Sequence, residues 1–268
     1  MTTASSGPRP EPLDQFGAYA DVYDLVYEDK DYASETSFVE RLFKRHRIET
    51  HRVLDVAAGT GGHALLLAER GYEVIAQDIS PSMADRTREK ASARGLKLEI
   101  NGGADMRTLP LPATPFDAVV CLFASVNYLL EAADLESFLA GVLRSLAPGG
   151  LFICDFWNGL ACLQAHERVR VKEAGDGARR FLRVSETELF PMVNQAVVSF
   201  RFVSLGESRS ASEIRETHRV RYFFPLEMAE AVVRSGLVLL ELVPFLDETR
   251  AAQPSDWNVT LVARRNEE

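Results

Sequence analysis

A strand, a glycine turn, a helix and a second strand follow one another early in the chain, and this order constrains the fold more than any other feature. Residues 53–56 (Val-Leu-Asp-Val) favour a strand and lead into the turn at 59–62 (Gly-Thr-Gly-Gly). Residues 64–70 have the composition of a helix, and residues 73–77 indicate a second strand that finishes at Asp78. Glycines allow the sharp turn, and the free N–H groups at the helix start face a crevice. Because a carboxylate at the tip of the second strand can accept hydrogen bonds from both ribose hydroxyls, we expect an adenosine-containing ligand.

The kind of ligand depends on Asp55. The spacing of Gly59, Gly61 and Ala64 also satisfies the dinucleotide fingerprint, which alone is a weak signal. An NAD site keeps apolar strand residues four positions before the first glycine, where this chain has Asp55. A carboxylate there would repel a pyrophosphate but suits a ligand with an ammonium group and a sulfonium. The pattern Asp55-x-x-x-Gly59-x-Gly61 therefore resembles motif I of the class I S-adenosylmethionine (SAM) methyltransferases; the alternative is a ligand-free turn kept for packing.

A later crevice loop supplies candidates for the adenine side of the ligand. Ser80 is placed to cap a helix that runs to about Arg94, and residues 97–100 indicate the third strand. The loop after this strand contains Asp105 and Met106, where a carboxylate can accept the adenine amino proton; the alternative is that Asp105 only caps a turn. With the resemblance added, the expected cofactor-binding residues are Tyr19, Tyr32, Asp55, Ala57, Gly59, Gly61, Asp78, Ile79, Met83, Asp105, Met106 and Leu122.

Size, charge and cysteine content limit the partners. The 268 residues suffice for one large core plus a lid, and the formal net charge of −9 offers no positive field for phosphates. We therefore expect a small-molecule acceptor and no nucleic acid. No apolar run approaches a membrane span, and residues 1–12 lack the apolar segment of a signal peptide, so we expect a cytoplasmic protein without a membrane partner. Cys121, Cys154 and Cys162 lack the CxxC spacing of a metal site, which predicts reduced core residues and no metal.

The N-terminal region is expected to combine a disordered tail with an aromatic helix. Residues 1–12 are rich in Ser, Gly and Pro, and Phe16, Tyr19, Tyr23 and Tyr27 then recur at helical spacing. One interpretation is a stripe that faces the core. The sharper interpretation is that Tyr19, Tyr23 or both cover the reactive methyl group, because an aromatic face or a phenol oxygen stabilises a sulfonium.

The fourth expected strand, residues 116–122, brings polar side chains to the crevice. In a doubly wound sheet its carboxyl end lies at the switch point, so the residues that follow should border the methyl group. Ser125, Asn127 and Tyr128 are therefore substrate-facing candidates.

A helix over residues 135–146 follows, with Asp134 as its expected cap and residues 148–150 (Pro-Gly-Gly) as its stop. Residues 151–155 indicate the fifth strand. Because strands and helices alternate up to this point, the sheet is expected to be parallel with right-handed crossovers.

Beyond residue 155 the hydrophobic period becomes that of antiparallel strands. Residues 179–189 and 196–205 alternate polar and apolar side chains and predict an inserted antiparallel sheet, which we interpret as a lid. In its last strand Glu216, His218 and Tyr222 share a face with apolar residues, which is costly unless they find partners or a substrate. His218 is either a general base or a satisfied structural histidine. The arginines on the opposite face are expected to be solvated.

Two final strands, residues 237–243 and 257–263, predict an antiparallel hairpin that the all-parallel sheet of a dehydrogenase lacks. Trp257 and Asn258 begin the last strand and either line the substrate pocket or pack. The expected fold class is α/β: a Rossmann-like doubly wound seven-stranded sheet with a C-terminal antiparallel hairpin, plus an antiparallel β lid insertion. The expected division is a tail at 1–12, a SAM-binding core with N-terminal helices at 13–158, a substrate lid at 159–224 and a return to the core sheet at 225–268.

A nearer resemblance rests on several of these segments together. The segments are Tyr19 through Tyr32, Asp55 through His63, Asp78-Ile79-Ser80, Asp105-Met106-Arg107, Leu122 through Tyr128 and Pro148-Gly149-Gly150. They look like the small-molecule methyltransferases that include the nucleotide-linked amino-sugar N,N-dimethyltransferases of antibiotic pathways. The match covers residues 16–158 well and the lid poorly, and Ala58 stands where we expect a cysteine in that family.

This resemblance implies SAM as cofactor and in-line methyl transfer to an amino group of a small molecule, such as a nucleotide-linked amino sugar or a related natural-product intermediate. The expected catalytic residues are His218, Tyr19 and Tyr23. The expected substrate-binding residues are Ser125, Asn127, Tyr128, Trp157, Glu216, Tyr222 and Trp257.

Other functions stay open at this point. They are a small-molecule O- or C-methyltransferase, an NAD-dependent oxidoreductase and a non-catalytic SAM-binding regulator. The sequence does not decide the oligomeric state, and a homodimer is kept as a candidate assembly.

Overall fold

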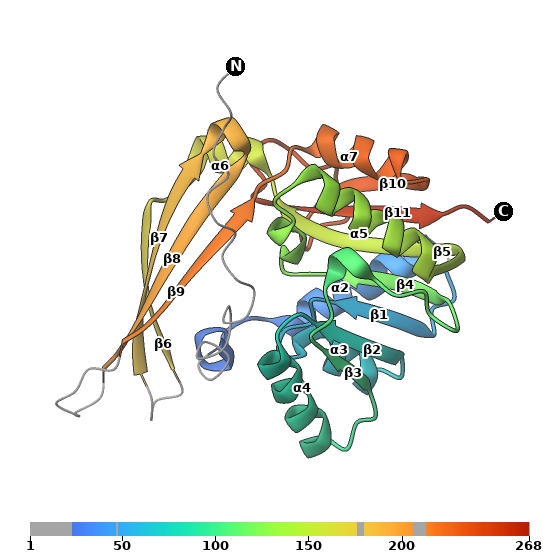
Figure 1. The fold of residues 1–268 in the computed structure, drawn as a ribbon, viewed down its shortest axis with the longest axis horizontal. Helices are drawn as coiled ribbons and strands as arrows, with labels where there is room; N and C mark the ends of the chain where they lie inside the picture. The colour runs from blue at the N-terminus through green and yellow to red at the C-terminus, as the bar shows by residue number, and fades with distance from the viewer. Residues whose placement is uncertain (1–22, 47, 176–179, 206–212, 268) are drawn as a thin grey trace.

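The computed structural model describes residues 23–46, 48–175, 180–205 and 213–267, which form two sheets of different kinds (Figure 1). The expected tail at 1–12 lies outside the described residues, as do Phe16 and Tyr19. Within the described part of the chain, no helix has both the length and the apolar composition needed to cross a membrane.

The larger sheet has seven strands in the order β10-β11-β5-β4-β1-β2-β3, which confirms the expected fold class. Strands β1 to β5 run parallel, and β11 is antiparallel to both β5 and β10. Strand β1 lies between β4 and β2, so β2 and β3 follow on one side of β1 while β4 and β5 lie on the other. At such a switch point the carboxyl ends of the two neighbouring strands, here β1 and β4, border a crevice. The strands are β1 (Arg52–Val56), β2 (Glu73–Asp78), β3 (Glu99–Gly102), β4 (Phe116–Cys121), β5 (Leu146–Trp157), β10 (Leu237–Pro244) and β11 (Asn258–Arg265).

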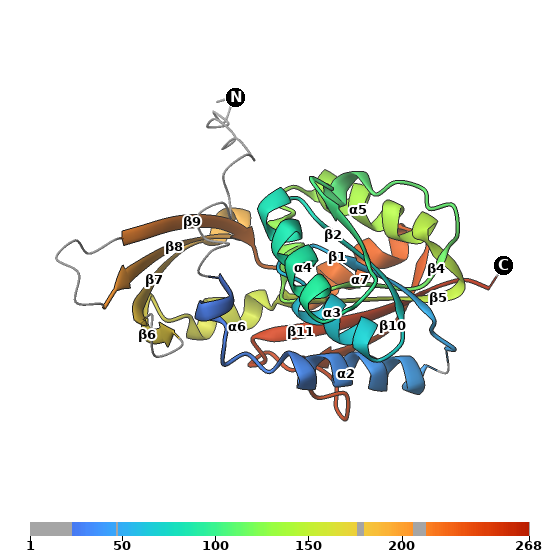
Figure 2. The same cartoon turned by 90° about the horizontal axis from the view of Figure 1, so that it is seen from below.

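Helices cover both faces of this sheet (Figure 2). Apolar side chains of α5 and α7 pack in one buried cluster with the strands, and those of α2 and α3 pack in another. The three cysteines are buried free thiols, as expected for reduced core residues. The helices are α2 (Tyr32–Arg45), α3 (Gly62–Glu69), α4 (Pro81–Ala93), α5 (Ala132–Ser145), α6 (Gly159–Ala165) and α7 (Pro225–Arg234).

Two element boundaries differ from those expected. Helix α5 begins at Ala132 after Glu131, so Asp134 lies in its first turn and is not its cap. Residues 148–150 were expected to separate a helix from a strand, but β5 already begins at Leu146. They lie where the pairing of β4 with β5 is irregular, and Gly149 adopts a φ of +76° there. A bulge of this kind accommodates Pro and Gly inside a strand.

The smaller sheet is antiparallel, with the order β6-β7-β8-β9. Three of its strands were expected from the alternating pattern, whereas β6 and the short helix α6 before it were not. The exposure along β9 alternates as expected: His218 and Val220 are buried, and Arg215, Thr217 and Arg219 are exposed. A turn was expected from Gly206 to Glu213; residues 206–212 lie outside the described part, and Glu213 is the first residue of β9. The strands are β6 (Val169–Gly175), β7 (Arg180–Phe190), β8 (Gln195–Ser204) and β9 (Glu213–Arg221).

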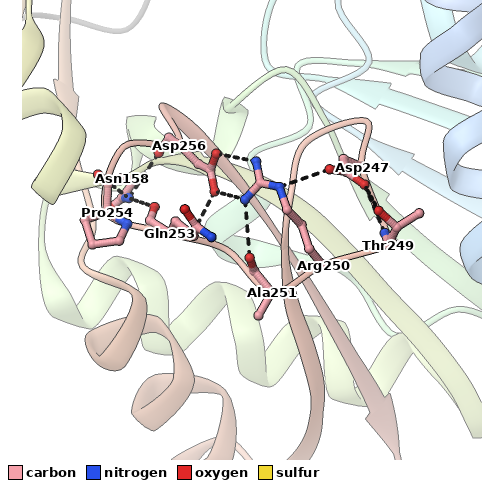
Figure 3. Close-up of polar contacts among 8 residues, drawn as sticks. All are labelled: Asn158, Asp247, Thr249, Arg250, Ala251, Gln253, Pro254 and Asp256. Carbon is pink, nitrogen blue, oxygen red and sulfur yellow. Dashed lines mark hydrogen bonds and ion pairs between the residues drawn. The ribbon is translucent and has the colours of Figure 1, made fainter.

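Asn158, where the chain leaves the large sheet, is held by several hydrogen bonds (Figure 3). Its Oδ1 accepts the N–H of Leu160 and caps α6, while its Nδ2 lies 3.0–3.4 Å from three carbonyl oxygens of residues 253–256. The same loop is closed by Arg250, whose guanidinium binds Asp247 and Asp256. The loop between β10 and β11 therefore holds the base of the smaller sheet.

Candidate active site

A cavity of about 410 Å³ opens between the carboxyl ends of the core strands and the smaller sheet. Its wall combines the loops after β1, β2, β3 and β4 with inward-facing residues of β8 and β9. Among the sequence-predicted residues, the lining includes Tyr23, Ala57, Gly59, Asp78, Ile79, Met83, Asp105, Met106, Ser125, Asn127, Tyr128, Trp157 and His218.

The loop after β1 is shaped by left-handed backbone positions. Ala57 and Gly59 have φ values of 57° and 59°, and a Cβ added to Gly59 would meet nothing within 4 Å. Gly61 has a different role, because a Cβ there would lie 2.6 Å from Thr87 Cγ2. Gly61 therefore allows α4 to approach the loop, and it does not line the cavity.

Asp78 is fixed at the cavity wall by two backbone donors. Gly59 N–H donates to its Oδ2 and Ser80 N–H to its Oδ1, both at 2.8 Å. Burial raises the pKa of this carboxyl. Because each carboxylate oxygen has a further acceptor position, Asp78 can still receive the two hydroxyls of a ribose.

Asp55 is a buried carboxyl, and no positively charged side chain of the described residues shifts its pKa. The backbone N–H of Ala64 hydrogen-bonds it, but its Oδ2 has no partner among the described residues. Burial, and then the negative charge of Asp78, raise its pKa to about 8. Asp55 lies behind the cavity wall, where a positively charged ligand would relieve this cost. These two carboxyls and the open loop at Gly59 fit a ligand that carries both a ribose and a cationic methionine part.

Asp105 and Met106 line the cavity, but Asp105 is already engaged. It caps a short 3-10 helix by accepting the Arg107 N–H, and its carboxylate also binds the Arg107 guanidinium. This contact holds the pKa of Asp105 below its ordinary value. The capping alternative is therefore observed, and the adenine contact stays a prediction.

The N-terminal segment is seated against the loop after β1. Thr60 Oγ1 donates to Asp24 Oδ1 at 2.6 Å, and Tyr23 and Tyr27 both line the cavity. Tyr32 does not: its ring packs on His63, with 5.0 Å between the centroids. Tyr19 lies outside the described residues.

His218 on β9 and Tyr128 in the segment after β4 form a polar pair in the cavity wall. The distance from Tyr128 Oη to His218 Nδ1 is 3.0 Å, and the His218 side chain is nearly fully buried. Burial lowers the pKa of His218 to about 4, so the imidazole is neutral at pH 7 and a weak proton acceptor. His218 is thus placed for contact with a substrate, while its role as a base stays a prediction.

Besides Tyr32, Asp55 and Gly61, four more of the expected residues lie outside the cavity wall. Leu122 is buried in the core cluster of α2 and α3. Tyr222 follows the end of β9, so the alternation no longer turns it inward; it is fully buried beside Phe224. Trp257 packs edge-on against Trp157. Glu216 is on β9 two residues before His218 and is half-buried.

The sequence analysis missed a buried polar contact beneath the cavity. Asp155 Oδ2 accepts the Ala124 N–H at 2.9 Å and the Asn258 Nδ2 at 3.1 Å. Burial raises the pKa of Asp155 to about 7. Ala124 and Asn258 both line the cavity. The available signal was a lone carboxyl at the end of an apolar strand, Leu151 to Asp155.

Comparisons with known proteins agree with this site. A family model described as "Methyltransferase domain" matches residues 53–150. The chain is 27% identical over 239 residues to dTDP-3-amino-3,6-dideoxy-alpha-D-glucopyranose N,N-dimethyltransferase of Streptomyces fradiae, covering 88% of this chain and 89% of that protein. It is 44% identical to demethylmenaquinone methyltransferase of Thermus thermophilus, but that match covers only 39% of this chain and 47% of the relative.

Two solved structures share this fold, and each covers 92% or more of the chain. The structure of Streptomyces venezuelae DesVI has a TM-score of 0.77 at 25% identity and covers 92% of this chain and 98% of its own. A SAM-dependent methyltransferase from Clostridium acetobutylicum has a TM-score of 0.80 at 20% identity, covering 93% and 98%. The methyltransferase family model, the relatives and the shared fold thus agree: the chain is a class I SAM-dependent methyltransferase that acts on a small molecule and resembles the amino-sugar N,N-dimethyltransferase group.

Proposed function

We propose that this enzyme transfers methyl groups from SAM to the amino group of a nucleotide-linked amino sugar or a related natural-product intermediate. The observation that carries the proposal is the extent of the similarity to the Streptomyces fradiae dimethyltransferase. It spans 88% of the chain and therefore reaches into the smaller sheet, which supplies one wall of the cavity. A match confined to residues 53–150 would support only the shared cofactor.

The cofactor-binding residues have distinct roles in this proposal. SAM supplies an electrophilic methyl group on a sulfonium. Asp78 holds the ribose, the loop at Gly59 together with Asp55 accommodates the methionine end, and Met106 borders the adenine. Positioning then provides most of the catalysis, because the leaving group is already present on the cofactor.

The polar pair of His218 and Tyr128 in the cavity wall suits an amine acceptor. The acceptor nitrogen bonds the methyl carbon with its lone pair, the electrons of the carbon–sulfur bond go to sulfur, and the nitrogen then loses a proton. A neutral amine needs no base before it attacks, whereas a hydroxyl does. His218, with a pKa of about 4, is too weak a base for a hydroxyl but can accept a hydrogen bond from an amine or ammonium group. This favours N-methylation over the O-methyl alternative.

Methylation of defined acceptors tests the proposal. The protein is incubated with SAM and dTDP-3-amino-3,6-dideoxyglucose, and the products are followed by mass spectrometry. The matched control acceptor has a hydroxyl in place of the amine. We expect methyl transfer to the amine alone, together with calorimetric binding of S-adenosylhomocysteine and none of NAD.

Each other result identifies a different function. Methylation of the hydroxyl control would indicate an O-methyltransferase. Tight S-adenosylhomocysteine binding without transfer to any acceptor would favour a non-catalytic regulator, and NAD binding would mean that Asp55 had been misread. The homodimer and the exclusion of nucleic acid and membranes as partners stay predictions from the sequence.

A further inference from the structure

Asn258, at the start of β11, is a polar residue of the cavity wall without a role in the function proposed above. It is the register partner of Trp157, and both residues line the cavity. Its Nδ2 donates to Asp155 Oδ2 at 3.1 Å. Asn258 thus joins the cavity to the buried carboxyl beneath it.

The chemistry of Asp155 determines how the Asn258 amide is turned. The same Asp155 Oδ2 accepts the Ala124 N–H at 2.9 Å, so this oxygen serves as an acceptor for two donors. An asparagine amide has one donating and one accepting end, and only the NH2 group can satisfy Asp155. The amide oxygen, Oδ1, is therefore the end left for a ligand.

Asp155 also sets the shape of the neighbouring turn. Phe123 and Ala124 have φ values of 61° and 54°, which are uncommon for residues other than glycine. Such positions persist where surrounding contacts over-determine them, and the bond from the Ala124 N–H to Asp155 is one of these contacts. One carboxylate oxygen thus fixes two separate parts of the cavity wall.

We propose that Asn258 Oδ1 accepts a hydrogen bond from an N–H of the acceptor amine, and that Asp155 is the positioning residue that holds the Asn258 amide in this orientation. The inference rests on the proposed N-methylation. With an N–H bound to Asn258, rotation of the amine about its carbon–nitrogen bond is restricted and its lone pair can be held toward the methyl group.

This contact also distinguishes a third methyl transfer from the first two. A primary amine has two N–H groups, and the monomethyl product has one, so both can bind Asn258 as neutral amines. After the second transfer and loss of the proton, the nitrogen carries two methyl groups and no N–H. A third transfer would proceed without the contact and should be about tenfold slower than the second, the scale of one hydrogen bond.

The experiment compares three variants with the wild-type enzyme on the same amino sugar. Asn258→Ala removes the acceptor; Asp155→Ala releases the amide of Asn258; Asp155→Asn keeps an oxygen that can accept from both Ala124 and Asn258. Asn101→Ala, at an exposed position of β3 away from the cavity, is the matched control. The readouts are kcat and KM for the unmethylated, monomethyl and dimethyl acceptors, and the Kd of S-adenosylhomocysteine.

We expect Asn258→Ala to lower kcat/KM roughly tenfold, the scale of one hydrogen bond, and to leave the Kd of S-adenosylhomocysteine within about twofold. The loss should apply to the unmethylated and the monomethyl acceptor alike, because both offer an N–H to Asn258. Asp155→Ala should reproduce this pattern, and Asp155→Asn should recover most of the lost turnover. With the wild-type enzyme a third transfer should be about tenfold slower than the second.

Two results would overturn the inference while methyl transfer itself stands. One is an unchanged kcat/KM of Asn258→Ala for both the unmethylated and the monomethyl acceptor; the other is a third transfer by the wild-type enzyme that is as fast as the second. If Asp155→Ala does not fold, Asn258→Ala and Asp155→Asn still decide the question. Failure of the wild-type enzyme to methylate any amine would remove the proposed function, and the amine contact with it.

Discussion

Replacing Asp55 with asparagine should stabilise the ligand-free protein and weaken its binding of the cofactor. The pKa of this carboxyl is raised to about 8 from an ordinary value of 3.8, first by burial and second by Asp78. At pH 7 the carboxyl is therefore ionised in the unfolded chain and protonated in the folded one. Each pKa unit corresponds to about 1.36 kcal/mol, so the roughly three units between the ordinary value and pH 7 cost about 4 kcal/mol at most.

The variant recovers only part of this free energy. The introduced asparagine can still accept the Ala64 N–H with its amide oxygen, but its NH2 group occupies the position of the Asp55 Oδ2, which has no partner in the described part of the protein. A buried donor without a partner costs about 1–3 kcal/mol. The expected net gain in the free energy of unfolding at pH 7 is therefore about 1–3 kcal/mol.

The pH dependence distinguishes this mechanism from a general change in packing. Because the folded-state pKa lies above the unfolded one, the folded protein binds the extra proton, and stability declines as pH rises from about 4 to about 8. Asp78 and Asp155 contribute in the same direction, so the informative quantity is the difference between wild type and Asp55→Asn. That difference should grow with pH up to about 8 and then level off.

Urea denaturation between pH 5 and pH 9 measures the effect, and calorimetry measures S-adenosylhomocysteine affinity on the same samples. Asp85→Asn removes the same charge from an exposed position of α4 and is the control. The reasoning fails if the unfolding free energies of wild type and Asp55→Asn keep a constant difference across this pH range. It also fails if the variant is less stable than the wild type at pH 8.

Three further changes test the other parts of the site. Asp78→Ala should weaken S-adenosylhomocysteine binding roughly 100-fold in calorimetry, because two charge-assisted hydrogen bonds to the ribose are lost; an unaltered affinity would remove the ribose assignment. His218→Ala should lower turnover and leave the affinity for S-adenosylhomocysteine nearly unchanged, and full activity would reduce this residue to packing. Since the pKa of His218 is about 4, its protonation should not shape the kcat profile between pH 6 and pH 9. Asn158→Ala should destabilise the protein by about 2 kcal/mol or more in thermal unfolding, since a helix cap and bonds to three carbonyl oxygens disappear; a change no larger than that of Asn101→Ala would contradict this.

The cofactor half of the site was predictable because its residues belong to one local unit. Asp55, Gly59 and Asp78 lie on β1, the following loop and β2, and the βαβ connection alone brings their strand ends together. Gly61 shows the limit of this reasoning. The pattern places it in the binding loop, yet its lack of a Cβ serves the packing of Thr87, which no local pattern indicates.

The acceptor half depends on contacts between distant segments. Asp155 and Asn258 are separated by 103 positions, and Tyr128 and His218 by 90. The pairing of β11 with β5 decides that Asn258 meets the cavity while Trp257 packs beside Trp157, and a shift of one residue would exchange the faces. Tyr222 was misplaced because the alternation was extended past the end of β9. The alternation of side chains along a strand predicts which face of the sheet a residue occupies only as far as the strand continues.

The carboxyls around the cavity differ in whether a nearby cation compensates their charge. Asp105 has its charge compensated by Arg107, and its pKa is lowered. Asp55, Asp78 and Asp155 have raised pKa values, and none has a cation among its hydrogen-bonding partners in the described chain. Groups of this kind destabilise the free protein, which a purely structural role does not explain. A ligand that brings a sulfonium, an ammonium group and ribose hydroxyls offsets the cost at Asp55 and Asp78, while Asp155 acts through the amide of Asn258. The same energetic pattern therefore marks both the cofactor half and the acceptor half of one site.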